Sequence, residues 1–138
     1  MAHVLVVDDD EFVRVTLSLL LETAGHTVAT AASGRDALAA VGATRVDLVI
    51  CDVFMPDMDG FETLRALKRQ APALPVVAIS GERATLPGFP APDYLKMAVE
   101  LGAEASLRKP LDLKEVRAVV ARCLAAAEHG APSRGPAP

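Results

Sequence analysis

Acidic, hydroxyl and amine side chains directly follow four short segments of this sequence, three of which are continuous apolar runs. The residues at these positions are Asp8 and Asp9 after VLVV, Asp52 after LVIC, Ser80 after VVAI, and Lys109 after ASLR. Carboxylates that share one pocket repel each other and raise each other's pKa unless a cation joins them. Oxygen ligands favour a hard divalent ion, above all Mg²⁺. A carboxylate beside Mg²⁺ can accept a phosphoryl group while a hydroxyl and an ammonium hold the phosphate oxygens, so the pattern indicates aspartyl-phosphate chemistry.

Each polar residue near these positions also has a structural interpretation when it is taken alone. Asp10 and Asp59 are typical helix N-caps, and Asp57 is typical of a turn in the segment MPDMDG. Ser80 alone would be a turn residue, and Lys109 alone would be a surface lysine. The functional interpretation rests on the whole set, because its members follow successive strands of one predicted sheet.

The elements that must position these side chains alternate along the chain. Apolar runs predict strands over 3–7, 27–31, 46–51, 76–79 and 105–108. Helical spacing, caps and glycine or proline stops predict helices over 11–24, 33–41, 59–70, 93–101 and 112–127. This alternation predicts a parallel sheet with right-handed crossovers and helices on both faces. Ligands of such sheets lie beyond the carboxyl ends of the strands, where the candidate residues stand.

Composition and charge narrow the class of protein. The chain has 138 residues, 51% of them hydrophobic, which is enough for one globular domain without metal or disulfide staples. The net charge of −4 argues against a general nucleic-acid binder. Cys51 and Cys123 lack metal-ligand spacing, and Cys51 is predicted to be a core residue. We expect a cytoplasmic protein with no membrane insertion, because the sequence shows no signal peptide, no apolar run of about 20 residues and no disulfide framework.

Four motifs together resemble the receiver domain of two-component response regulators. They are VVDDD at 6–10, CDVFMPDMDG at 51–60, AISG at 78–81 and Lys-Pro at 109–110. The resemblance covers residues 3–127 and implies an α/β, flavodoxin-like (βα)5 three-layer sandwich with a parallel sheet of order 2-1-3-4-5. We expect a receiver domain over 1–127, of the stand-alone type, and a disordered Pro/Gly-rich tail over 128–138.

The resemblance also implies a role for each site residue. Asp52 would be the phosphoacceptor, Ser80 would hydrogen-bond the phosphoryl group, and Lys109 would pair with it. Mg²⁺ would be held by the side chains of Asp8, Asp9 and Asp52 and by the main-chain carbonyl of Phe54. The bond between Lys109 and Pro110 is a candidate cis peptide. The implied role is a phosphorelay switch that is not an enzyme, beyond assisting its own phosphotransfer and dephosphorylation.

The partners follow from that role. A sensor histidine kinase or a histidine phosphotransfer protein would supply the phosphoryl group, and an unknown downstream protein would receive the signal. No direct contact with nucleic acid is expected.

Three features depart from the family pattern. Residues 82–92 (ERATLPGFPAP) form a longer connection than usual and contain three prolines, which exclude a continuous helix. Ser106 occupies the strand position where the family often carries a switching aromatic residue, so coupling through a rotating ring is not expected. Phe54 stands two residues after Asp52, where it would shield a phosphoryl group from water.

Two other functions compete with the phosphorelay switch. One is a pseudo-receiver that binds partners without phosphorylation, although the complete set of acids argues against it. The other is an aspartate-nucleophile phosphatase of the haloacid dehalogenase kind, for which Asp57 and Asp59 would supply the paired acids. Five residues, however, separate Asp57 from the predicted strand, and the last of them is Pro56. An EF-hand fails on the spacing of its acids.

Overall fold

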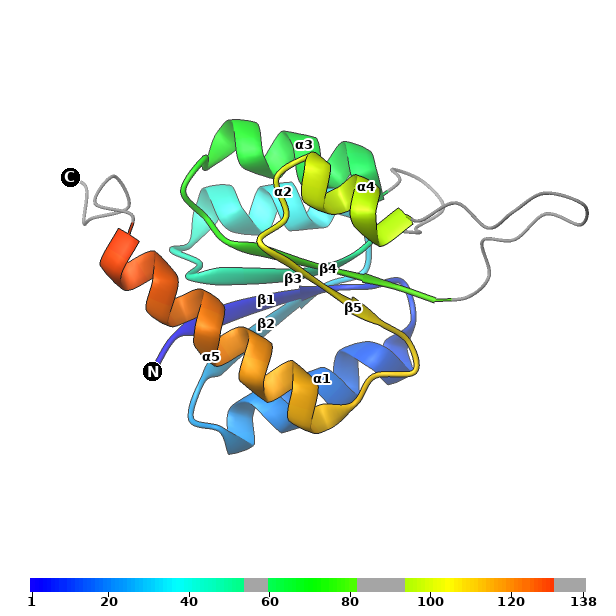
Figure 1. The fold of residues 1–138 in the computed structure, drawn as a ribbon, viewed down its shortest axis with the longest axis vertical. Coiled ribbons are helices and arrows are strands. Elements are labelled where there is room, and N and C mark those ends of the chain that lie inside the picture. Colours follow the sequence, from blue (N-terminus) through cyan, green and yellow to red (C-terminus); the bar gives the residue numbers. More distant parts are fainter. Residues whose placement is uncertain (54–59, 82–93, 131–138) are drawn as a thin grey trace, which may run out of the picture.

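The computed structural model describes residues 1–53, 60–81 and 94–130, and these form a three-layer α/β sandwich (Figure 1). Within the described residues, five parallel strands form one sheet of order β2-β1-β3-β4-β5, which confirms the predicted topology. The strands are β1 (His3–Val7), β2 (Thr27–Ala31), β3 (Leu48–Asp52), β4 (Val76–Ser80) and β5 (Ala105–Arg108).

Helices cover both faces of this sheet, as the alternation predicts. They are α1 (Glu11–Thr23), α2 (Gly34–Ala43), α3 (Gly60–Gln70), α4 (Tyr94–Glu100) and α5 (Leu113–Gly130). Figure 1 shows α1 and α5 on one face and α2, α3 and α4 on the other. None of the described helices combines the length and the apolar character that a bilayer crossing requires.

The sheet is the centre of the core because its middle strands are apolar on both faces. All five residues of β3 and of β4 are buried, which is typical of a parallel sheet covered by helices on each side. Leu64 and Leu67 of α3 belong to the apolar cluster on one face, and Leu17 and Leu21 of α1 belong to the cluster on the other. This double-sided burial fixes the strands as a platform for the groups at their ends.

Local signals explain where most helices begin and end. The Asp10 side chain accepts a hydrogen bond from the amide of Phe12 and caps α1, as predicted. The Ser33 hydroxyl caps α2 in the same way, accepting from the amide of Asp36. Gly25 and Gly102 follow α1 and α4 with φ angles of 97° and 115°, a left-handed conformation that favours glycine.

Several boundaries differ from the prediction by a few residues. β3 begins at Leu48 and includes Asp52, and β4 includes Ser80, so these site residues are the last residues of their strands. Parallel pairing extends each strand by one polar residue that the apolar pattern alone does not mark. α5 continues to Gly130, beyond the predicted end at 127, because the alanine-rich sequence that precedes Gly130 favours helix. Residues 82–92 and the tail from 131 lie outside the described residues.

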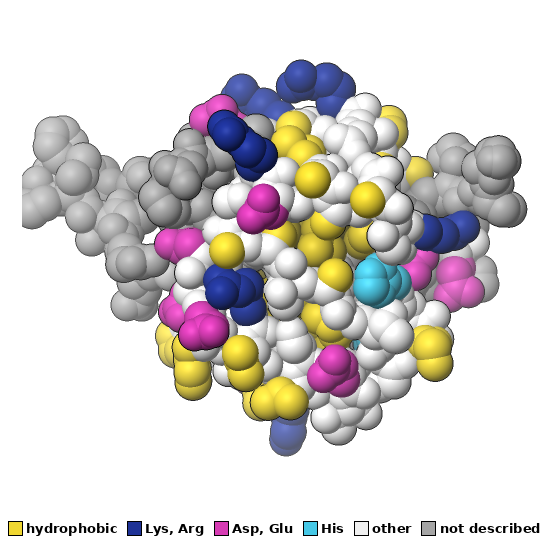
Figure 2. Space-filling model, turned by 180° about the vertical axis from the view of Figure 1, so that it is seen from behind, with side chains coloured by type: hydrophobic (Ala, Val, Ile, Leu, Met, Phe, Trp, Pro, Cys, Tyr) yellow, Lys and Arg dark blue, Asp and Glu magenta, His cyan; other side chains and the backbone are white. Residues whose placement is uncertain are grey.

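Figure 2 shows the face of the molecule opposite to that of Figure 1. Among the described side chains on that face, acidic and basic groups are interspersed rather than gathered by sign. Apolar side chains protrude along its lower edge, where α1 lies, and the exposed apolar residues of α1 are Phe12, Val15 and Leu19.

Candidate functional site

The register of the sheet brings the predicted site residues to one edge. Val7 lies opposite Cys51 in the β1–β3 pair, so Asp8 and Asp52 each come one residue later. Asp52 in turn pairs with Ile79, which precedes Ser80, and Ser80 pairs with Arg108, which precedes Lys109. The carboxyl ends of the four strands therefore place Asp8, Asp52, Ser80 and Lys109 side by side.

Lys109 lies between two buried carboxylates. Its Nζ is 3.0 Å from Oδ2 of Asp8 and 3.1 Å from Oδ2 of Asp52. The contact with Asp52 has the geometry of a hydrogen bond, whereas the contact with Asp8 is an ion pair without that geometry. Asp8 and Asp52 are 0% and 1% exposed, so the Lys109 ammonium pairs with two carboxylates that are shielded from water.

Burial makes Asp8 a weak acid for an aspartate. Desolvation is the main cause, and the nearby charge of Asp52 adds to it, while the amide of Asp10 and the ammonium of Lys109 act in the opposite direction. Together these effects raise the pKa of Asp8 to about 6. Burial acts to lower the pKa of Lys109, but the carboxylates of Asp8 and Asp52 outweigh it and raise that pKa above its usual value. The negative charge of the carboxylates at this edge of the sheet is therefore only partly balanced by Lys109.

The donor set at this edge fits a divalent cation. Carboxylate oxygens of Asp8, Asp9 and Asp52 lie within 4.8 Å of one another, and Asp9 is exposed on the solvent side. Oδ2 of Asp8 is buried and makes no hydrogen bond in the described part of the chain; its contact there is the ion pair with Lys109, so its lone pairs can still bind a cation. Hard oxygen donors with one open side suit Mg²⁺, which keeps several of its waters.

The connection from β1 to α1 holds Asp8 through a short series of hydrogen bonds. The amide of Asp10 donates to Oδ1 of Asp8 at 2.9 Å, and Nη1 of Arg14 donates to the main-chain oxygen of Asp8 at 2.8 Å. The amide of Asp8 itself donates to the carbonyl of Ala31, which extends the β1–β2 ladder by one bond. Arg14 is not among the predicted site residues, because a lone arginine in a helical segment is typical of a surface position.

The corner between β3 and α3 depends on Gly60. Its amide donates to the carbonyl of Val53 at 3.2 Å, and a Cβ at this position would collide with the backbone of Val53 and Asp52. The motif around 51–60 contains this glycine, but its close approach to β3 was not predicted. The predicted metal ligand Phe54 lies outside the described residues, as do Asp57 and Asp59 of the phosphatase alternative.

Ser80 and the chain that follows β5 complete the edge. Ser80 is 3% exposed, and its hydroxyl donates to the carbonyl of Gly81 at 3.2 Å. The amide of Lys109 donates to the carbonyl of Ser80 at 2.8 Å, so the two residues are joined through the backbone as well. The peptide bond between Lys109 and Pro110 is cis, as predicted. Ser106 lies opposite Ala78 in the β4–β5 pair.

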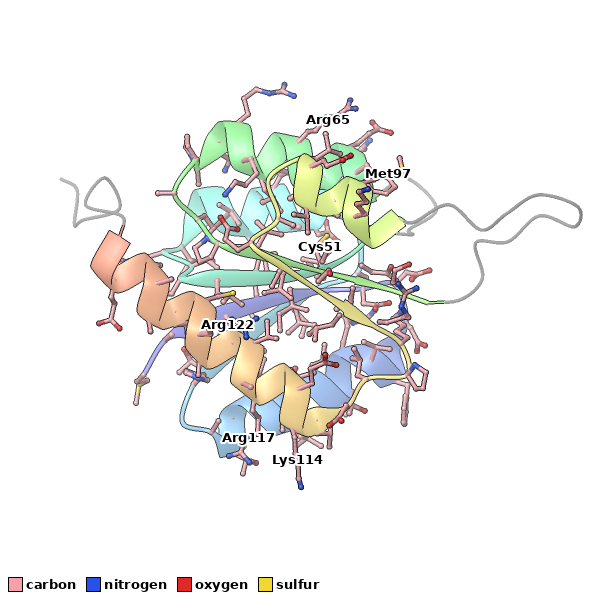
Figure 3. All side chains as sticks on the ribbon, in the orientation of Figure 1. Cys51, Arg65, Met97, Lys114, Arg117 and Arg122 are labelled. Carbon is pink, nitrogen blue, oxygen red and sulfur yellow. The ribbon has the colours of Figure 1, made fainter. Side chains whose placement is uncertain are left out.

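Cys51 is a core residue, as predicted. It is 1% exposed and lies in the interior of the sheet (Figure 3). Burial, together with the charges of Asp52 and Asp8, raises the pKa of its thiol well above the usual range, so it stays a neutral thiol.

The fold and the site together have the arrangement expected of a receiver domain. They combine a parallel (βα)5 sandwich with acids, a hydroxyl and a lysine at the strand ends. The family model of the response regulator receiver domain matches residues 4–121. The chain therefore belongs to the response regulator receiver family, whose members act in two-component signalling.

Curated relatives and solved structures are consistent with this assignment. The transcriptional regulatory protein ZraR of Salmonella typhimurium is 38% identical over 88% of this chain and 26% of its own length. The alkaline phosphatase synthesis transcriptional regulatory protein PhoP of Bacillus subtilis is 32% identical over 94% of this chain and 51% of its own length. The chain thus spans a quarter to a half of these relatives.

Two receiver structures match over almost the whole of both chains. The chemotaxis protein CheY4 of Vibrio cholerae has a TM-score of 0.77 and 34% identity, and the match covers 89% of this chain and 98% of that one. A receiver domain protein from Clostridium thermocellum has a TM-score of 0.81 and 27% identity, over 93% of this chain and 98% of that one.

Proposed function

We propose that this domain accepts a phosphoryl group on Asp52 in a reaction that requires Mg²⁺. The observation that carries the proposal is the position of Asp52, at the end of β3 with its carboxylate on Lys109 and beside Asp8 and Asp9. A buried carboxylate next to further carboxylates is a poor nucleophile toward a phosphate unless their negative charge is offset. Lys109 offsets part of that charge, and a divalent cation held by the acids would offset the rest.

The chain's own residues have separable tasks in this reaction. A carboxylate oxygen of Asp52 forms the new bond to phosphorus while the bond from phosphorus to the donor's histidine nitrogen breaks. Bound Mg²⁺ would neutralise charge on the phosphoryl oxygens. Asp8 and Asp9 would hold the cation, and the main-chain carbonyl of residue 54 remains the fourth proposed protein ligand.

Phosphorylation also moves negative charge away from Asp52. The acyl phosphate has no carboxylate charge, because that oxygen is now bonded to phosphorus, and the charge lies on the phosphoryl oxygens instead. Lys109 is 3.1 Å from Oδ2 of Asp52 and is the cation that can follow this charge outward. The Ser80 hydroxyl, at the end of the neighbouring strand, would leave Gly81 and donate to a phosphoryl oxygen. These two changes, the movement of Lys109 and the new hydrogen bond of Ser80, are the proposed first step of the conformational switch.

The proposed donor is a sensor histidine kinase or a histidine phosphotransfer protein, and the proposed output is a contact with a downstream protein in the cytoplasm. Membership of the receiver family supports the donor class. The absence of an aromatic residue at 106 means that a route other than a rotating ring would carry the signal.

Intact-mass measurement tests this function. The protein is incubated with acetyl phosphate, with and without Mg²⁺, and we expect the mass of one phosphoryl group to be added only when Mg²⁺ is present. Asp52→Asn should abolish the addition, whereas Asp36→Asn, the same change on α2, should leave it intact. A wild-type protein that stays unmodified under these conditions would instead favour a pseudo-receiver that binds partners without phosphorylation.

A further inference from the structure

Arg14 ties the start of α1 to the acidic edge of the sheet. Its Nη1 donates to the main-chain oxygen of Asp8 at 2.8 Å, and its own amide donates to the carbonyl of Asp10 at 3.1 Å. The side chain is half-buried, and Figure 1 shows α1 beginning at the edge where β1 ends. One residue therefore contacts the backbone on both sides of Asp9.

The location of this arginine is unfavourable for the helix itself. It lies near the N-terminal end of α1, where the helix dipole disfavours positive charge. Its guanidinium is instead directed to the first residue beyond β1, at the acidic edge. This placement indicates that the Arg14 side chain stabilises the acidic segment 8–10 rather than the helix.

The contact has a direct consequence for Asp9. A peptide unit is planar, so holding the oxygen of Asp8 fixes the plane that leads into Asp9. On the far side of Asp9, the amide of Asp10 is held by Oδ1 of Asp8 at 2.9 Å. The backbone of Asp9 is thus fixed from both ends, although its side chain is exposed. A carboxylate on a fixed backbone loses less conformational entropy when it takes a ligand.

We propose that Arg14 is a positioning residue for the cation site. By holding the peptide between Asp8 and Asp9, it keeps the exposed carboxylate of Asp9 within reach of the buried carboxylates of Asp8 and Asp52. Arg14 acts through this backbone and touches neither the cation nor the phosphoryl group. This role rests on the proposed function, because it presumes that the acids hold a divalent cation.

Direct measurement of Mg²⁺ binding tests the proposal without any phosphorylation assay. The dissociation constant is measured by calorimetry, and the rise in unfolding temperature on adding Mg²⁺ is measured in parallel. We expect Arg14→Met to weaken Mg²⁺ binding about tenfold, the low end of the effect of losing a partner that orients metal ligands. The metal-free unfolding temperature should stay close to that of the wild type. Arg14→Lys, which keeps a donor on a long stem, should restore part of the affinity.

Arg117→Met is the matched control, because it makes the same change on the outer side of α5, where the side chain points away from the sheet (Figure 3). It should bind Mg²⁺ as the wild type does. Equal Mg²⁺ affinities for Arg14→Met and Arg117→Met would overturn the proposal while leaving the proposed function intact. If Arg14→Met does not fold, Arg14→Gln, whose amide is too short to reach Asp8, decides by the same comparison. A wild type that binds no Mg²⁺ would refute the metal-dependent function and this role with it.

Discussion

Asp8 is the residue whose chemistry links the site to the stability of the domain. Its side chain is fully buried, and its pKa of about 6 lies above the ordinary value of 3.8 that it would have in the unfolded chain. Between these two values the native state binds more protons than the unfolded state. The stability that protonated Asp8 contributes is therefore complete below pH 4 and is lost as the pH rises through 6.

Asp8→Asn should remove this pH dependence, because asparagine stays neutral. Without divalent metal, we expect the variant to be more stable than the wild type at pH 7, by on the order of 3 kcal/mol at 1.36 kcal/mol per pKa unit. The difference should shrink toward zero at pH 4. Urea unfolding followed by far-ultraviolet circular dichroism measures it, and Asp36→Asn controls for the change in net charge. A difference that is constant from pH 4 to pH 7 would contradict this account of Asp8.

At the scale of elements, the corner between β3 and α3 depends on the absence of a side chain. Gly60 brings the start of α3 against the backbone of Val53 and Asp52 so closely that a methyl group cannot fit. This close approach fixes where the chain turns after Asp52. The start of α3 and the end of β3 thus pack directly against each other.

Gly60→Ala should therefore damage both stability and the site. We expect a loss of 1–3 kcal/mol, roughly the cost of overpacking a filled core, and a clear fall in phosphorylation of Asp52 by acetyl phosphate. Gly42→Ala is the control: it makes the same change within α2, where the nearest atom to the new Cβ is the side-chain amide of Gln70 at 3.4 Å. That variant should be as stable as the wild type or up to about 1 kcal/mol more stable. If the two alanine variants unfolded alike, the close approach at Gly60 would have no energetic role.

At the scale of the whole molecule, the sequence was sufficient to predict the sheet and most of the edge. Parallel strands bring their carboxyl ends together, so the polar residues after the apolar runs were bound to meet, as Asp8, Asp52, Ser80 and Lys109 do. The contributions of Arg14 and Gly60 could not be read in the same way. The first depends on a side chain that returns to a backbone oxygen, and the second on a distance between two elements. Neither leaves a periodic signal.

Asp52 is the residue proposed to carry the phosphoryl group, and chemical trapping identifies the modified residue by its position. An acyl phosphate of aspartate is reduced by borohydride to homoserine, which peptide mass spectrometry locates by residue. After treatment with acetyl phosphate and Mg²⁺, we expect homoserine at position 52 of the wild type and unmodified aspartate at 8, 9 and 36. Homoserine at another aspartate, or at none while the intact mass still shows a phosphoryl group, would contradict this assignment.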